Sequence, residues 1–158
     1  MSSVPFSAAT EVEQIAERLI DDRFAFLSEL DVRIEYRFTS KITKKNGKVI
    51  LGTARKITGL SAHWGNATDP FFAIIITELT WHKLKPLQKE ALVDHELRHL
   101  YAEQDEESGE VVLSILGHDF EGFCEEIKRY GAWKSDVEQI IKASHEAPYQ
   151  LSFDEAAA

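Results

Sequence analysis

Apolar residues near the N-terminus recur with the spacing of a helix. They follow one another every three or four positions from Val12 to Ile20, so we expect a helix over about residues 10–30. Thr10 followed three residues later by Glu13 has the pattern of a capping box, which predicts that this helix starts near Thr10.

Strand patterns and turn signals follow. Residues 31–38 alternate strictly between polar and apolar, which is typical of a strand with one buried face. Asn46-Gly47 predicts a tight turn, because both residues tolerate positive φ. Residues 63–70 are turn-forming and predict a loop. Three segments are expected to be strands: residues 31–38, residues 49–57 paired with a segment around residues 40–43, and the dense apolar residues 71–79.

The C-terminal half predicts helices. Pro86 suits the first turn of a helix, and no breaker follows before about residue 103. An acidic loop is expected over residues 104–110, and residues 111–116 are apolar without a clear period. Further helices are expected over residues 119–130 and 134–143. A helix, then strands, then helices predicts an α+β fold with a small antiparallel or mixed sheet.

Length and charge narrow the functional classes. A chain of 158 residues suits one domain over residues 1–158, with flexible ends at residues 1–9 and 149–158. The 44% hydrophobic content excludes a wholly disordered chain. The net charge of -9 argues against general binding to nucleic acid or anionic lipid, although a local basic patch stays possible. The pattern leaves the oligomeric state open.

Cysteine content and hydropathy bear on the compartment. Cys124 is the one cysteine, which excludes an intrachain disulfide and a four-cysteine zinc ribbon. The N-terminal residues lack the basic and apolar regions of a signal peptide, and the apolar run 71–76 is too short to span a bilayer. We therefore expect a cytoplasmic protein with no membrane partner.

The segment with the clearest chemistry is His95-Glu96-Leu97-Arg98-His99, an H-E-x-x-H motif. On a helix, His95 and His99 lie one turn apart on one face and can bind a single metal ion. Zinc lowers the pKa of bound water to about 7, and Glu96 is placed to accept its proton as a general base. The alternative is an amphipathic helix whose two histidines pair with carboxylates.

A catalytic zinc site needs a third protein ligand. His118 is the best candidate, 18 residues beyond His99 and directly after Gly117, which allows a tight turn. Asp119 or Glu121 could supply an oxygen ligand instead. His63 and His82, which precede the motif, are expected to be loop or surface residues.

Four stretches together resemble the putative phage metallopeptidase family: FFAIIITEL, LKPLQKEALV, LVDHELRHL and GHDFEGFCEEIKRYG. The chain is also similar, more distantly, to SprT-like proteases, which carry H-E-x-x-H and then Gly-His before a helix. The resemblance implies a zincin-like fold, with His118 as third ligand and Glu96 as catalytic base. It also implies a location in the host cytoplasm if a phage encodes the protein. SprT-like proteins often add a cysteine zinc ribbon or DNA-binding parts. This chain has neither, so no nucleic acid partner is expected.

The sequence leaves two candidate functions. The first is a zinc-dependent metallopeptidase that hydrolyses a peptide or protein substrate with Glu96 as general base. The alternative is a zinc-stabilised, non-catalytic protein-binding or regulatory domain of zincin-like fold. In the zincin-like architecture the strand before the motif helix commonly edges the cleft, so residues 71–77 could pair with an extended peptide. The alternative is an internal core strand, and the apolar density of the segment fits both.

Overall fold

The computed structural model describes residues 6–61 and 64–148, and the chain divides into two compact units after Leu116. The ends expected to be flexible at residues 1–5 and 149–158, as well as His63, lie outside the described residues. Phe6–Ala8, expected to belong to a loose arm, instead forms a paired strand. The prediction of a single domain stays a prediction, because compact units can belong to one domain or to two.

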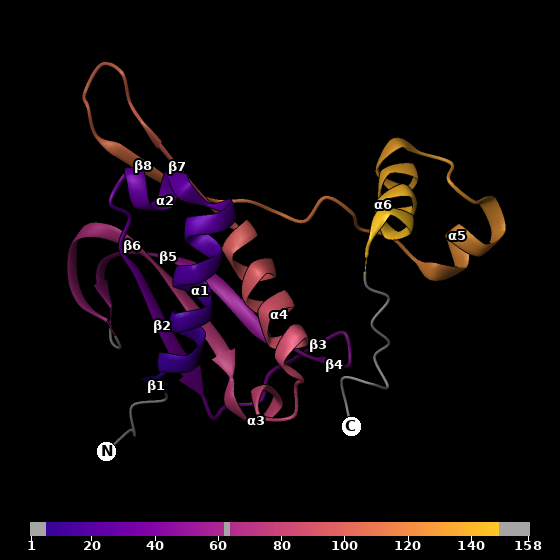
Figure 1. Cartoon of the computed structure of the whole chain (residues 1–158), viewed down its shortest axis with the longest axis horizontal. Helices are drawn as coiled ribbons and strands as arrows, with labels where there is room; N and C mark the ends of the chain where they lie inside the picture. Colours follow the sequence, from indigo (N-terminus) through magenta and orange to yellow (C-terminus); the bar gives the residue numbers. More distant parts are fainter. Residues whose placement is uncertain (1–5, 62–63, 149–158) are drawn as a thin grey trace. The chain divides into compact units, whose positions relative to one another are not determined.

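The first unit combines a mixed four-stranded sheet with helices and two small hairpins. Its elements, in chain order, are β1 (Phe6–Ala8), α1 (Thr10–Arg23), α2 (Ala25–Glu29), β2 (Ile34–Thr39), β3 (Lys44–Lys45), β4 (Lys48–Val49), β5 (Gly52–Ser61), β6 (Gly65–Thr77), α3 (Glu78–Trp81), α4 (Pro86–Arg98), β7 (Leu100–Gln104) and β8 (Val111–Ile115) (Figure 1). The four-stranded sheet has the order β1-β2-β6-β5. Strands β2 and β6 are parallel and the other two pairs antiparallel, which confirms an α+β fold with a mixed sheet.

One face of this sheet carries the main core. Phe72, Ile74 and Ile76 alternate along β6 and are fully buried among apolar residues of α1 and α4. The intervening residues of β6 point to the opposite face. There Phe71 and Ala73 form a second, smaller cluster with Ile57 and Trp64.

The N-terminal helix starts where expected, but it ends early and has a different cap. Ala9 is the N-cap, without a side-chain hydrogen bond, so the predicted Thr10–Glu13 capping box is wrong. Phe24 leaves helical geometry at φ -129° and ψ 40°, and it separates α1 from α2. Its buried ring belongs to the core, which explains a break that periodicity does not reveal.

Pairing within the sheet differs from the prediction in two places. The turn at Asn46-Gly47 is confirmed, with φ of 52° and 76°, but it joins the short strands β3 and β4. Strand β5 pairs with β6. The expected pairing with residues 40–43 is limited to the Ile50 amide, which donates to the Thr43 carbonyl at 2.9 Å before β5 begins. Strand β6 already begins at Gly65, within the expected loop. Because β6 lies between β2 and β5, the expectation that residues 71–77 form a cleft edge open to a peptide is wrong.

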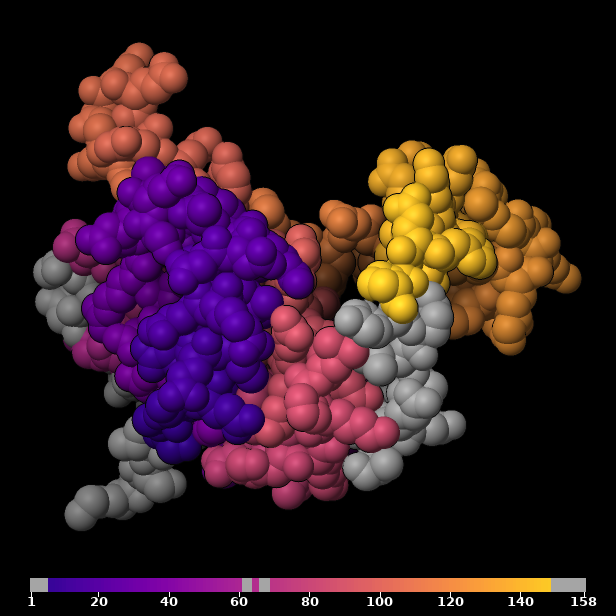
Figure 2. Space-filling model, viewed as in Figure 1, coloured from indigo at the N-terminus to yellow at the C-terminus, as the bar shows by residue number. Residues whose placement is uncertain are grey.

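The motif helix α4 ends at Arg98, five residues before the predicted end, and the chain continues as the β7–β8 hairpin. The expected acidic loop forms the tip of this hairpin, which projects from the first unit (Figure 2). Residues 111–116, whose type the sequence left open, contain β8.

The second unit, in its described part, contains α5 (Cys124–Tyr130) and α6 (Ser135–Glu146). Helix α5 starts five residues later than expected, because the Glu126 carboxylate accepts a hydrogen bond from the Phe123 amide and caps the helix there. Gly131, at φ 65°, ends it where predicted. None of the helices in the described residues is long and apolar enough to cross a membrane.

Candidate metal centre

The last turn of α4 presents His95 and His99. Pro86 occupies the start of the helix, where its missing N–H removes no hydrogen bond. The Gln88 side chain accepts a hydrogen bond from the Lys85 amide at 2.9 Å. His99 is the C-cap and not a mid-helix residue, yet it keeps helical angles of φ -73° and ψ -17°. The one-turn spacing therefore survives the early helix end, and the two imidazole centroids lie 5.1 Å apart.

Backbone pairing at the base of the β7–β8 hairpin brings the third histidine close. The Leu116 amide donates to the His99 carbonyl at 2.7 Å, which holds Leu116 beside the helix end. His118 follows two residues later, and two residues of extended chain span at most about 7 Å. One ligand nitrogen from each of His95, His99 and His118 lies within 4.8 Å of the other two.

A second contact of Leu116 orients the His99 ring. Nδ1 of His99 lies 2.6 Å from the Leu116 carbonyl oxygen. A carbonyl can only accept, so Nδ1 carries the proton and the lone pair of the neutral ring sits on Nε2. Metal-binding histidines are commonly oriented in this way, by a hydrogen bond from the other ring nitrogen to a carbonyl.

The donor set fits zinc. Imidazole nitrogens bind Zn²⁺ at about 2.0–2.1 Å, so two of them on one ion lie at most about 4.2 Å apart. The three ligand nitrogens lie within 4.8 Å of one another, which is close to this distance. Small side-chain rotations would bring them to the separation that a shared ion requires. His95 and His118 are exposed and His99 is half-buried, so solvent reaches the cluster. Three protein ligands would leave the fourth position of a tetrahedral ion open.

Glu96 turns away from solvent beside this cluster. Its side chain is 3% exposed, and burial raises the pKa of its carboxyl to about 7, against a smaller opposing effect of His99. The carboxyl packs against β5: a Cβ added at Gly52 would lie 3.0 Å from Oε1 of Glu96. Sequence reasoning missed Gly52, although an isolated glycine within a strand is a known sign of close approach.

Charged side chains hold the last turn of α4 against α1. Asp94 accepts hydrogen bonds from Arg98 Nε at 2.6 Å and from Arg23 Nη1 at 2.8 Å. Arg98 also lies over the Phe24 ring, 5.3 Å from its centroid. Arg98, inside the motif, therefore makes an ion pair and an aromatic contact on the flank of the helix.

The other candidates lie elsewhere. Among the described residues, Asp119 and Glu121 are not part of the histidine cluster. His82 is 61% exposed and lies 3.6 Å from Glu78 on α3, in line with the expected surface role. Cys124 is exposed at the start of α5.

One known protein family matches nearly the whole chain. The family model described as "Putative phage metallopeptidase" matches residues 4–145, nearly the whole chain. Neither the curated proteins nor the solved structures give a match. The match covers the motif helix, the hairpin that follows it and His118. The chain therefore belongs to the putative phage metallopeptidase family.

Proposed function

We propose that this protein is a zinc-dependent metallopeptidase of zincin-like fold, which hydrolyses peptide bonds with Glu96 as general base. The observation that carries the proposal is the convergence of three histidine nitrogens within 4.8 Å, directly beside a buried carboxyl. Membership of the family supports a metallopeptidase in general. The chemistry of the donor set supports zinc as the ion.

Each residue has a distinct role in this proposal. His95, His99 and His118 hold the ion. Zinc, when bound, polarises a water molecule and the carbonyl of the scissile bond. Glu96 accepts a proton from the attacking water and passes it to the leaving amine. Without a metal, burial raises the pKa of this carboxyl to about 7, and a cation bound beside it would favour the carboxylate that accepts the proton.

The proposed peptide path follows β5. This strand ends the order of the four-stranded sheet, so among the described residues one of its edges has no strand partner in that sheet. Gly52, the first residue of β5, contacts the Glu96 carboxyl. An extended peptide that pairs with this edge would pass the general base, and main-chain hydrogen bonds would bind it.

The first test measures metal. Protein purified without a histidine tag is analysed by plasma mass spectrometry beside His118→Ala. We expect about one zinc per chain in the parent protein, and loss or weakening in the variant, because two ligands bind zinc less tightly than three. An absence of zinc after refolding with zinc would contradict the proposal.

The second test measures hydrolysis on a peptide library. Glu96→Gln should lower cleavage at least about 100-fold, since a positioned general base contributes about 10²–10⁴-fold, and it should keep zinc because the ligands remain. Glu90→Gln on the same helix makes the same chemical change away from the cluster and should cleave normally. Zinc binding with no cleavage that depends on Glu96 would instead favour the non-catalytic binding domain.

A further inference from the structure

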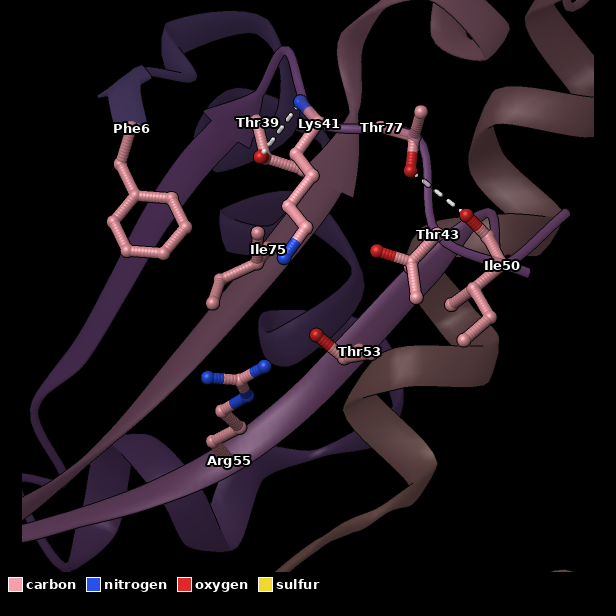
Figure 3. Close-up of a pocket in the computed structure, with 10 residues that line it drawn as sticks. Phe6, Thr39, Lys41, Thr43, Ile50, Thr53, Arg55, Ile75 and Thr77 are labelled. Carbon is pink, nitrogen blue, oxygen red and sulfur yellow. Dashed lines mark hydrogen bonds between the residues drawn. The ribbon is translucent and has the colours of Figure 1, made fainter. Parts of the chain in front are cut away.

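A pocket of about 360 Å³ opens on the first unit, beside β5 and β6 (Figure 3). Side chains alternate across the sheet, so the neighbouring Thr53 and Ile75 lie on the face opposite the core residue Ile76. Thr53 and Ile75 line the pocket. A Cβ at Gly52 would approach Glu96 and Ile76, on the core side. The side chains of Thr53 and Ile75 therefore lie on the face of the sheet opposite Glu96, and Gly52 borders both the pocket and the Glu96 carboxyl.

The lining of this pocket is cationic and rich in hydroxyls. Lys41 and Arg55 contribute their charged ends, which point toward each other across Ile75 (Figure 3). No carboxylate lines the pocket. Within the described residues neither cation has a carboxylate within ion-pair distance. The hydroxyls of Thr43 and Thr53 also line it and have no protein hydrogen-bond partner in the described part of the chain.

The charge around the pocket contrasts with the charge of the whole protein. Residues 33–56 contain eight Lys and Arg residues and one acidic residue, Glu35, whereas the whole chain carries -9. Uncompensated positive charge in an acidic protein attracts anions to this face of the sheet. The sequence left room for a local basic patch, and the structure shows that part of it gathers around a concave site.

We propose that this pocket binds the phosphate group of a small phosphorylated molecule. The planar guanidinium of Arg55 can donate two parallel hydrogen bonds to phosphate oxygens, and Lys41 adds a second positive charge that matches a phosphate dianion. Thr43 and Thr53 can donate further hydrogen bonds. Phe6 and Ile75 offer an apolar wall to the rest of the ligand, and the volume lies within the range of about 300–1,000 Å³ of small-molecule sites.

The proposal is tested by titration with inorganic phosphate and with phenyl phosphate at constant ionic strength, followed by amide chemical shifts. We expect saturable shifts at Thr39 and Thr53, with phenyl phosphate binding more tightly because its ring reaches the apolar wall. The same titration with a single-stranded thymidine octanucleotide without terminal phosphates should bind more weakly. Tighter binding of the oligonucleotide than of phenyl phosphate would overturn the proposal in favour of a nucleic-acid surface.

Charge variants locate the binding. Lys41→Gln and Arg55→Gln should each weaken phenyl phosphate binding about tenfold, as expected for loss of a charge-assisted hydrogen bond. Lys48→Gln and Lys56→Gln remove the same charge outside the pocket and should change affinity less than about twofold. All four side chains are exposed, so the variants should fold, as checked by thermal melts. Equal weakening in all four would overturn the proposal.

A final control separates this pocket from the histidine cluster, because a bound metal can itself attract phosphate. The titration is repeated on His95→Ala, in which the proposed metal site is disrupted. We expect unchanged shifts at Thr53 and unchanged affinity. Loss of binding in His95→Ala would assign the phosphate to the metal centre and contradict the pocket.

Discussion

Gly52 makes room for Glu96. The carboxyl of Glu96 and the side chain of Ile76 occupy the space that a Cβ at position 52 would take, at 3.0 Å from Oε1 and 2.8 Å from Cδ1. Ile76 is fully buried, so its side chain has little freedom to move aside. The place of the proposed general base therefore depends on a missing side chain in a neighbouring strand.

Gly52→Ala should consequently destabilise the fold and displace Glu96. We expect a loss of about 1–3 kcal/mol in the free energy of unfolding, typical of overpacking, measured by urea denaturation. The proposed hydrolysis should fall while zinc content stays unchanged, because the atoms nearest to the new methyl group belong to Ile76 and Glu96 and not to the proposed ligands.

Ile76→Val supplies the matched control, because it removes Cδ1, the atom nearest to the new methyl group. The double variant should lose less stability than the sum of the two single variants, since the steric conflict is shared. If the losses of stability in the two single variants simply add in the double variant, the destabilisation by Gly52→Ala does not come from a steric conflict with Ile76.

At the scale of elements, α1 and α4 are joined by side chains at both ends. Glu11 accepts hydrogen bonds from Trp81 Nε1 at 3.0 Å and from Lys89 Nζ at 2.8 Å. Arg23 and Asp94 pair near the other end of α1. The contact between these helices sets the direction of α4, and thus where its last turn carries the motif.

Glu11→Gln should weaken this link in a pH-dependent way. The hydrogen bond from Lys89, and next the one from Trp81, lower the pKa of Glu11 below its usual 4.5. A carboxyl whose pKa is lower in the folded state stabilises the fold at pH values above its pKa in the unfolded chain. This stabilisation is lost as pH falls through the pKa of the folded state. Glu11 is 49% exposed, so the expected loss at pH 7 is below about 1 kcal/mol, and it should shrink as pH falls through the lowered native pKa.

Glu13→Gln is the control for this measurement. It removes a carboxylate from the same first turn of α1, but in the described residues Glu13 has no ion pair. Denaturation of the three proteins at pH 7 and near pH 3 should show a pH-dependent difference for Glu11→Gln that exceeds the one for Glu13→Gln. Equal differences would assign the effect to the helix dipole.

At the scale of the whole molecule, the histidine cluster connects distant parts of the chain. His95 and His99 end α4, whereas His118 follows the complete β7–β8 hairpin. An ion bound by all three would close this loop at its base, beside the hydrogen bonds of Leu116 to His99. Binding to the folded state but not to the unfolded chain stabilises the fold.

Removal of zinc by a chelator should therefore lower the melting temperature. At a zinc concentration about 1,000 times the dissociation constant, the stabilisation is about 4 kcal/mol. Calorimetric scans with and without chelator measure it. His118→Ala should reduce the shift, whereas His82→Ala, outside the cluster, should leave it unchanged. If the melting temperature of the parent protein were the same with and without chelator, the proposal of an ion bound by the three histidines would be contradicted.

Structure that is decided by neighbours along the chain could be predicted from the sequence. Helix α1, the turn at Asn46-Gly47 and the C-terminal stop at Gly131 follow from local periodicity and backbone preference. Structure that depends on pairing with distant segments could not be predicted. The partner of β5, the start of β6 and the end of α4 all depend on pairing with segments far away in the sequence.

The amino-acid sequence alone is enough to predict the one-turn spacing of His95 and His99, because helical geometry is local and His99 keeps helical angles even as the C-cap. It also pointed to His118 as a candidate. The proximity of the ligand nitrogens of His95, His99 and His118, within 4.8 Å of one another, could not be predicted from the sequence, because it depends on tertiary contacts. The burial of Glu96 against Gly52 and the Lys41–Arg55 pocket are likewise tertiary, because contacts across a sheet join residues that no local pattern relates.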